Sequence, residues 1–347
     1  MEVKTGIVKD WRYVEHNMGD YHPESPRRIQ AIYEMLEEEK IFSSLSIIEP
    51  RPAKHEEIAL IHAQEYVEQI KKTAGRERVC LDPDTSTSPR SCEVALLAAG
   101  GLLEAADRIM EGRVQNGFAL VRPPGHHAEA SQARGFCIFN NIAIAAQYLI
   151  EKWRLRRVLI VDWDIHHGNG TQNSFYSRND VLYFSTHQFP HYPGTGHWSE
   201  VGKGKGEGFT VNVPLTPGKA DDDFLFIYRE LLRPIAGAFK PEFILVSAGF
   251  DVFAGDPLGG MEVSVGGFGA LTAELMGLAH QTAQDRILFT LEGGYNLSGL
   301  RDGVKSVLLA LNGRGQKSAA KLSPSSALEG ELAPVFKVTK VFWPVGA

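Results

Sequence analysis

Short runs of apolar, mostly β-branched residues recur along the chain, separated by longer stretches with apolar residues at helical spacing. The clearest run covers 158–161, reads VLIV and has no polar alternation, which is typical of a strand buried on both faces of a parallel sheet. Runs of the same kind predict further strands at 6–8, 118–121, 181–185, 211–214, 243–248 and 287–291.

The segments between these strands carry apolar residues three and four positions apart, the spacing of one face of an α-helix. Ser25 followed by Pro26 is typical of a helix start, because serine caps the first turn and proline fits its first position. Helices are predicted at 26–40, 55–73, 93–110, 141–153, 221–239, 266–284 and 297–311. Strands that alternate with helices of this length predict an α/β fold with one mostly parallel sheet covered on both faces.

Two segments lack this alternation. Residues 81–91 (LDPDTSTSPRS) are rich in proline and serine, and we expect a loop without regular structure there. Residues 1–312 are assigned to one domain, whereas 313–347 begin with a small, polar stretch typical of a linker or disordered tail. Within that tail, 335–343 (VFKVTKVFW) alternate apolar and basic residues, which predicts an edge strand that docks back or pairs with another subunit.

Composition places the chain among ordinary globular proteins and narrows its partners. Its 347 residues are 43% hydrophobic and 22% charged, with a formal net charge of -6. This balance argues against direct nucleic-acid binding and is compatible with a cationic substrate. Three cysteines without a C-x-x-C pair suit a reducing compartment and argue against a thiolate zinc knuckle. Because the sequence shows no apolar leader and no apolar segment long enough to span a bilayer, we expect a cytoplasmic protein without a membrane partner.

Polar side chains that can bind metal follow two of the predicted strands. Asp162, Asp164 and His166 are two positions apart, and such side chains point to one face of an extended backbone. Asp251 follows the strand at 243–248, and open α/β sheets bind ligands at the carboxyl ends of their strands. A single aspartate at a strand end is more often a helix cap, but three such residues favour a catalytic zinc site with an open fourth position.

Three further side chains suit the chemistry of such a site. His126 and His127 follow a rigid PPG turn and lack apolar neighbours, and histidine titrates near the pH at which general acid-base catalysis operates. Tyr295 follows Gly293 and Gly294, which let the backbone approach a ligand closely, so its hydroxyl could donate to a developing oxyanion. The alternative for this residue is a core tyrosine after a flexible turn.

Five motifs in order make the chain similar to a known family. They are RPPGHHA, GFCIFNN, DWDIHHGNGT, SAGFD followed by GDPLGG, and LEGGYN, preceded by HPESP and DPDTSTSP segments. Over residues 6–312 they resemble the zinc-dependent histone deacetylase and acetylpolyamine amidohydrolase family, in its class II-like, bacterial branch. The resemblance implies a three-layer arginase/deacetylase fold with an eight-stranded, mostly parallel sheet. It also implies one Zn²⁺ per chain and hydrolysis of acetyl-lysine-like amides.

Motif positions carry catalytic roles over from the family. Asp164, His166 and Asp251 would be the zinc ligands. Tyr295 would polarise the amide carbonyl while His127 takes a proton from the attacking water. An imidazolium would then protonate the leaving amine.

The two adjacent histidines differ in the groups that would orient them. Asp162 occupies the family position that holds His126. Asn169 stands where class I members have an aspartate, and an amide cannot raise the basicity of His127 as a carboxylate would. Which histidine bears which proton therefore stays open, including the alternative in which His126 is the acid.

The resemblance further implies bound potassium and a substrate channel. Phe136 and Tyr192 would be aromatic walls that grip the lysine stem, Asp84 would hold the substrate backbone, and Arg28 would line an internal cavity. Each aromatic residue alone would more often be core, and Arg28 could equally be a solvated helix residue. The implied cation ligands are Asp162, Asp164, His166, Ser185 and Thr186 beside zinc, and Phe175, Arg178, Val181 and Phe209 at an outer site. The implied channel residues are Phe136, Tyr192, Leu258, Gly135, Gly293, Gly294, Asp84 and Arg28.

Three alternatives to a lysine deacetylase stay open. Polyamine-specific relatives carry a gatekeeper glutamate where this chain has Leu258, which favours a lysine side chain or another acyl amide, although an inserted loop at 187–208 could also select a polyamine. A binuclear manganese ureohydrolase would need a carboxylate two positions after His166, where Gly168 stands. A silent acyl-lysine binding module would be expected to lack the tyrosine or one of the paired histidines. The oligomeric state is also open, and a homo-oligomer is compatible with the sequence.

Overall fold

Eight strands form one sheet at the centre of the computed structural model, which describes residues 4–38, 44–314 and 322–346. Their order is β2-β1-β5-β10-β9-β6-β7-β8, and every neighbouring pair is parallel. The strands are β1 (Thr5–Val8), β2 (Ser46–Ile48), β5 (Asn116–Ala119), β6 (Val158–Asp162), β7 (Val181–Gln188), β8 (Thr210–Leu215), β9 (Phe243–Ala248) and β10 (Ile287–Leu291). The predicted α/β fold with an eight-stranded sheet is confirmed.

The central strands of the sheet explain why the candidate metal ligands lie together at its carboxyl edge. Strands β6, β9 and β10 are buried along their whole length, as expected for apolar strands covered on both faces. In the register of the sheet Asp162, the last residue of β6, lies opposite Ser185 of β7 on one side and Ser247 of β9 on the other. The residues that follow β6 and β9 therefore leave the sheet side by side.

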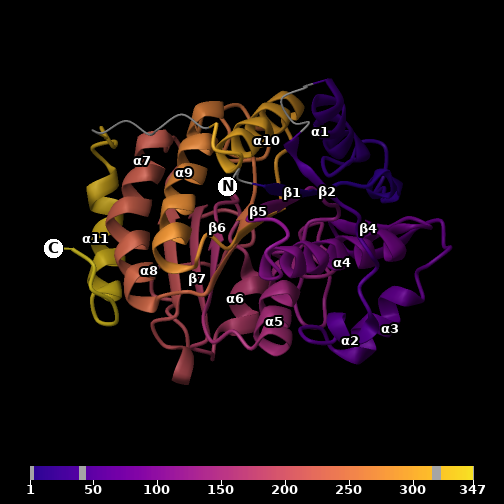
Figure 1. Cartoon of the computed structure of the whole chain (residues 1–347), viewed down its shortest axis with the longest axis horizontal. Helices are drawn as coiled ribbons and strands as arrows, with labels where there is room; N and C mark the ends of the chain where they lie inside the picture. Colours follow the sequence, from indigo (N-terminus) through magenta and orange to yellow (C-terminus); the bar gives the residue numbers. More distant parts are fainter. Residues whose placement is uncertain (1–3, 39–43, 315–321, 347) are drawn as a thin grey trace.

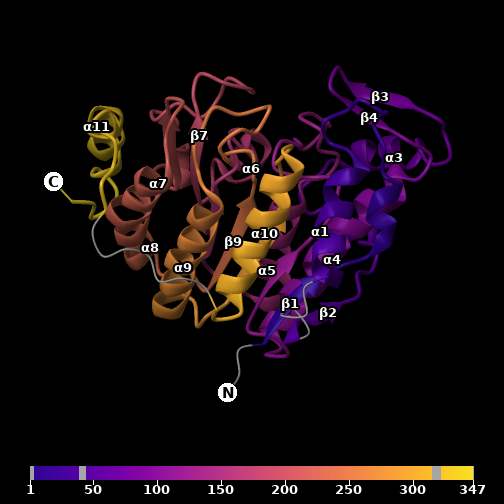
Figure 2. The ribbon, with the colours of Figure 1, turned by 90° about the horizontal axis from the view of Figure 1, so that it is seen from above.

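Helices cover both faces of the sheet (Figures 1 and 2). On one face α4 (Ser91–Met110) packs against α5 (Asn141–Trp153), and both contact central strands. Another layer runs from α1 (Pro26–Glu38) through α10 (Leu297–Leu311) and α9 (Val265–Thr282) to α8 (Arg233–Phe239). The other α-helices that precede residue 312 are α2 (His55–Ile58), α3 (Gln64–Lys71), α6 (Asn169–Phe175) and α7 (Asp221–Ile227). None of the helices within the described ranges is long and apolar enough to cross a membrane.

Three local expectations need correction. The predicted helix at 221–239 is interrupted by a π-helical turn at Tyr228–Leu232 just before Pro234, which has no N–H to continue regular α-helical bonding. The helical stretch at 55–73 is divided between α2 and α3. The segment at 81–91 is not without regular structure, because β3 (Val79–Asp82) and β4 (Thr85–Thr87) form a small antiparallel pair around the turn at Pro83. Two β-branched threonines favour the strand there over an irregular loop.

The C-terminal segment forms a helix, so the expected edge strand is wrong. Helix α11 (Leu328–Thr339) packs against β8, the last strand of the sheet. In Figure 1 it is the outermost helix, next to α7 and α8. Its buried residues Leu328, Leu332, Val335 and Thr339 recur at helical spacing, which a window beginning at 335 does not reveal. Beyond the helix, the Trp343 indole N–H donates to the Gly208 carbonyl at 2.6 Å. Residues 315–321 of the expected linker lie outside the described residues.

Candidate metal centre and active site

Three side chains from two neighbouring strands converge beyond the carboxyl edge of the sheet. Asp164 and His166 follow β6, Asp251 follows β9, and their ligand atoms lie within 4.8 Å of one another. His166 Nδ1 is 3.0 Å from Asp164 Oδ1 and 3.2 Å from Asp251 Oδ2. All three residues are buried, so their charges have little access to water. The predicted convergence is confirmed.

The surroundings of these side chains fit a divalent ion. Asp251 Oδ1 accepts from the Ile165 amide at 2.9 Å, whereas the buried Oδ2 faces His166 Nδ1 without a hydrogen bond of good geometry. A side chain at position 293 would place its Cβ 2.1 Å from Asp251 Oδ2, so Gly293 keeps that oxygen clear. Burial raises the pKa of Asp251, and the Asp164 carboxylate raises it further. Two like charges held this closely in a dry site are stabilised by a cation, and two carboxylate oxygens with one imidazole are ordinary zinc ligands.

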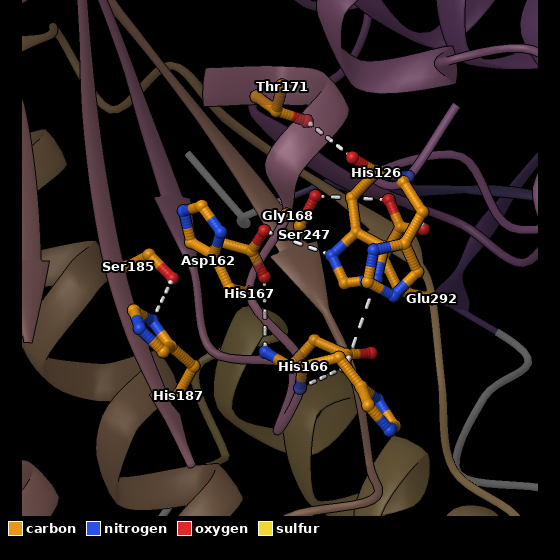
Figure 3. Close-up of polar contacts among 12 residues, drawn as sticks. His126, Asp162, His166, His167, Gly168, Thr171, Ser185, His187, Ser247 and Glu292 are labelled. Atoms are coloured by element: carbon orange, nitrogen blue, oxygen red, sulfur yellow. Dashed lines mark hydrogen bonds and ion pairs between the residues drawn. The ribbon is translucent and has the colours of Figure 1, made fainter. Parts of the chain in front are cut away.

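The two adjacent histidines lie beside this group but have different partners. Figure 3 shows one of them, His126, with its contact to Asp162. His126 Nδ1 is 3.1 Å from Asp162 Oδ2, whereas His127 Nδ1 is 2.8 Å from Asn169 Oδ1. Burial alone would lower the pKa of His126, but the Asp162 carboxylate outweighs it and raises that pKa to about 10. Burial and the neighbouring His126 hold the pKa of His127 well below its usual range. Asp162 thus lies beside His126 and Asn169 beside His127, and these contacts make the two rings chemically unequal.

Glu292 is a buried carboxylate that the sequence-based assignment missed. Its Oε2 accepts hydrogen bonds from the amides of Gly125, at 2.7 Å, and His126, at 3.2 Å. Its Oε1 accepts from the Ser247 hydroxyl at 3.0 Å, as Figure 3 shows. Burial raises the pKa of Glu292 to about 7. The residue directly follows β10, so the rule that identified Asp162 and Asp251, a charged residue at the end of an apolar strand, also applies to it.

A channel leads from the surface to this group. The cavity has a volume of 240 Å³. It is lined by Asp84, His127, Gly135, Phe136, His166, His191, Tyr192, Leu258 and Tyr295. The Phe136 ring stands nearly perpendicular to Tyr295, with centroids 5.9 Å apart, and Tyr192 stands likewise 5.0 Å from His127. These aromatic walls suit a narrow aliphatic chain. His191 was not predicted as a lining residue, because a lone histidine in a long loop gives no periodic signal.

Asp84 holds the wall of this channel together. Its Oδ1 accepts from the Gly135 amide at 3.0 Å and from the Thr85 hydroxyl at 2.7 Å. The neighbouring Phe136 amide donates to the Thr85 hydroxyl at 2.9 Å. The β3–β4 turn thus fixes the backbone that presents Phe136, so Asp84 has a contact within the protein in addition to the expected one with substrate.

Gly135 gives a local test of the channel, because an alanine there would place Cβ 2.3 Å from His127 Cδ2 at a backbone φ of 55°. We expect Gly135→Ala to lower the free energy of unfolding by about 1–2 kcal/mol from the left-handed backbone alone. Displacing His127 should also cut kcat by about 10²-fold. Denaturant unfolding and turnover measure the two effects. Gly112→Ala is the control, because Gly112 has a similar φ of 69° but open space where a Cβ would stand. It should lose stability and keep its activity. Loss of activity in both variants would contradict the reasoning.

Arg28, Gly293 and Gly294 do not line this cavity but support the turn that carries Tyr295. The Arg28 guanidinium donates to the carbonyls of Gly294 and Glu292, each at 2.6 Å, and lies 5.0 Å from the Tyr295 ring centroid. It also pairs with Glu24 at 3.0 Å. Because Arg28 is completely buried, the alternative of a solvated helix residue is wrong.

The residues expected to bind monovalent cations lie in two places. Ser185 and Thr186 lie on β7 next to Asp162, and the Thr186 hydroxyl is buried without a hydrogen-bond partner. At the outer position, the Phe175 carbonyl accepts from the Arg178 amide, and the Phe209 carbonyl accepts from the Tyr183 amide, each at 2.9 Å. Val181 begins β7 close by. The identity of any ion at these positions stays a prediction.

This arrangement defines a class of α/β protein before any relative is considered. Carboxylate and imidazole side chains that could bind a divalent ion lie at the base of a channel that His127 and Tyr295 also line. Such a site is suited to metal-assisted hydrolysis of a substrate that enters as an extended chain.

Comparisons with known proteins lead to the same family as the motifs. The histone deacetylase domain matches residues 22–311, and the chain belongs to the histone deacetylase family. A probable deacetylase of Archaeoglobus fulgidus is 39% identical over 85% of this chain and 82% of that protein. Histone deacetylase 15 of Arabidopsis thaliana is 39% identical over 93% of this chain, and histone deacetylase HDA1 of Candida albicans is 37% identical over 98%.

Coverage of the relatives differs. The chain spans 59% of the Arabidopsis protein and 44% of the Candida protein. The crystal structure of the HDA15 HD domain superposes with a TM-score of 0.92 at 38% identity, covering 99% of this chain and 96% of that one. The present chain therefore corresponds to a deacetylase domain, and the larger eukaryotic proteins contain further sequence.

Proposed function

We propose that this protein is a zinc-dependent deacetylase that hydrolyses the acetyl amide of N-ε-acetyl-lysine and releases acetate and a free amine. The observation that carries the proposal is the buried Asp164, His166 and Asp251 group at the base of a channel lined by Phe136 and Tyr295. Membership of the histone deacetylase family supports it. The two carboxylates and one imidazole would hold the zinc ion, leaving a position for water and substrate.

Each remaining side chain has a defined task in this reaction. When bound, zinc would supply the Lewis acid that polarises the carbonyl and favours deprotonation of water. The Tyr295 hydroxyl, whose pKa is raised well above its usual value by burial, stays protonated and donates to the carbonyl oxygen. His127 Nε2 accepts the proton of the attacking water, because Nδ1 is occupied by Asn169. A protonated imidazole then gives a proton to the leaving amine. The Asp162 carboxylate, which raises the pKa of His126, would stabilise a positive charge on the His126 ring.

Potassium at the position formed by Asp162, Ser185 and Thr186 is part of the same proposal. Ser185 lies directly opposite Asp162 in the sheet register, so oxygen atoms of two neighbouring strands meet there, and oxygen ligands suit a hard cation. A bound cation would add positive charge next to the Asp162–His126 pair and lower the basicity of that ring.

Acetylated lysine is proposed as the substrate in preference to an acetylated polyamine. Leu258 lies at the channel wall, so an apolar side chain stands where a second ammonium group would need a carboxylate. We expect acetyl-lysine peptides to be hydrolysed faster than acetylspermidine, and Leu258→Glu to raise kcat/KM on acetylspermidine about tenfold, equivalent to roughly 1.4 kcal/mol of charge attraction.

Leu258→Gln is the matched control, because it has the same length as glutamate without the charge. It should leave the preference for acetyl-lysine peptides in place. A wild-type preference for acetylspermidine would favour the polyamine alternative and place its recognition on another residue, such as one in the loop at 187–208.

The proposed activity is tested by incubating zinc-loaded protein with a fluorogenic acetyl-lysine peptide and measuring acetate release, with and without a chelator. Turnover that disappears on chelation and returns with zinc is the expected result. Tight peptide binding without turnover, by protein containing one zinc per chain, would instead establish a silent binding module.

A further inference from the structure

Asn169, the amide beside His127, does not act alone. Its Oδ1 faces His127 Nδ1 at 2.8 Å, and its Nδ2 donates to Glu129 Oε1 at 2.5 Å. The same Nδ2 lies 3.3 Å from the His127 carbonyl. A chain of hydrogen bonds therefore runs from the catalytic imidazole through a buried amide to a carboxylate.

The neighbours of Asn169 allow only one orientation of its amide. Both groups that face Nδ2, the Glu129 carboxylate and the His127 carbonyl, can only accept hydrogen bonds. A flipped amide would turn its oxygen toward these two acceptors and leave its NH₂ against His127 Nδ1. In the observed orientation Oδ1 accepts from Nδ1–H, and Nε2 is left with its lone pair on the side of the cavity that His127 lines.

Glu129 is itself held in place from the same helix. Asn173, four residues after Asn169 on α6, donates its side-chain N–H groups to Glu129 Oε1 at 3.0 Å and to Oε2 at 3.1 Å. The Glu129 amide donates to the Gln132 carbonyl at 2.9 Å, which fixes the backbone. The carboxylate thus sits over the first turn of α6, only partly exposed, with one oxygen pointed at Asn169.

We propose that Glu129 is a positioning residue for catalysis: it fixes the amide of Asn169 so that the neutral His127 ring carries its proton on Nδ1 and presents Nε2 as the base. The proposal rests on the proposed deacetylase function, because it assigns a task within that reaction. A charged acceptor holds an amide more firmly than a neutral one, and partners of this kind typically change activity about 10–100-fold when removed.

A purely structural role for Glu129 makes a different prediction. If the carboxylate only ties the loop after His127 to α6, its removal should lower stability and disturb KM and kcat together. A positioning role should instead lower kcat with little change in KM, since Glu129 is not among the residues that line the channel. Asn173→Ala is the matched control, because it removes an outer contact of Glu129 and leaves the Asn169 contact in place.

Four variants of the zinc-loaded full chain separate these roles. Glu129→Ala should lower kcat about 10–100-fold with zinc content unchanged, and Glu129→Gln should recover most of it, because the glutamine carbonyl can still accept from Asn169. Asn169→Asp removes the donor that Glu129 binds and places a second carboxylate beside it. Adding Glu129→Ala to Asn169→Asp should therefore cause no further loss, a non-additive result that double-mutant analysis detects.

A second measurement does not depend on turnover. Long-range ¹H–¹⁵N correlation spectra of histidine-labelled protein distinguish the two neutral tautomers, and His127→Ala identifies the signal. Wild-type protein should show the Nδ1–H form, and Glu129→Ala should show a mixture. Equal kcat in wild type and Glu129→Ala, or equal loss in the Asn169→Asp background, would overturn the inference. An inactive wild type that still shows the tautomer shift would reject the proposed function alone.

Discussion

Replacing Asp251 with asparagine is expected to remove the bound metal and lower turnover by at least about 10³-fold, because Lewis-acid stabilisation contributes several kcal/mol to the transition state. Asparagine has the same shape but no charge, and its amide nitrogen cannot bind a cation. Only one carboxylate, that of Asp164, would then remain beside His166. Elemental analysis of purified protein measures zinc per chain, and the acetyl-lysine peptide assay measures turnover.

The thermal stability of Asp251→Asn should also differ from that of wild type, and the difference depends on whether metal is present. In stripped wild-type protein Asp251 is a buried carboxylate close to a second one, an arrangement that raises the pKa of Asp251 and so opposes its ionisation. Asp251→Asn relieves that repulsion, so the stripped variant should unfold at the same or a higher temperature than stripped wild type. Added zinc should raise the unfolding temperature of wild type only.

Asp107→Asn is the control for the loss of a buried carboxylate. Asp107 accepts from the Tyr148 hydroxyl and the Trp153 indole between α4 and α5, away from the channel. It should lose stability but keep its zinc. Full zinc content in Asp251→Asn would show that Asp251 is not a ligand, and loss of zinc from Asp107→Asn would show that metal content follows general stability.

The parts of the site that could be predicted are those encoded in single strands. Asp164 and Asp251 come directly after fully apolar runs, and parallel strands bring such ends to one edge of the sheet whatever their order. Neighbouring positions of β6 and β9 in the sheet then place the two carboxylates together. Spacing alone cannot reveal that the strands are adjacent, so the strand ends could only suggest a shared metal site, and the family resemblance implied the same set of ligands.

The contacts that could not be predicted join distant segments. The family resemblance named Arg28 but not the groups that it binds. Arg28 resembles any charged residue on an amphipathic helix, and only the packing of α1 beside α10 shows that its guanidinium binds the carbonyls of Glu292 and Gly294. Its charge is balanced by Glu24, which also binds the buried Arg122. The local patterns of these segments contain no sign of such a network, because helical periodicity reports the buried face and not the partner.

The C-terminal helix illustrates a different limit. Alternation over a few residues fits a strand and part of a helix equally well, and the buried Leu328 and Leu332 that decide for a helix precede the alternating segment. Once folded, α11 binds the loop after β8, where Glu331 pairs with Lys219 at 2.9 Å and accepts from the Thr216 hydroxyl at 2.7 Å. The described part of the C-terminal segment is thus packed onto the deacetylase domain.

Replacing Tyr295 with phenylalanine is expected to lower kcat about 10²–10³-fold while zinc content and KM stay close to wild type. The hydroxyl is the only group removed, and its proposed donation to the carbonyl oxygen strengthens as negative charge develops there. Phenylalanine keeps the ring contacts with Phe136, at 5.9 Å, and with the Arg28 guanidinium, at 5.0 Å, so the channel wall should be preserved.

Steady-state kinetics on the acetyl-lysine peptide, with zinc analysis of the same preparation, test this expectation. Tyr148→Phe is the matched control, because it removes a hydroxyl that binds Asp107 far from the channel and should leave kcat unchanged. Wild-type kcat in Tyr295→Phe would remove the hydroxyl from the reaction, whereas a rise in KM alone would assign it to substrate binding. A fall confined to kcat would instead place its effect in the transition state, because an interaction equally strong in both states changes only binding.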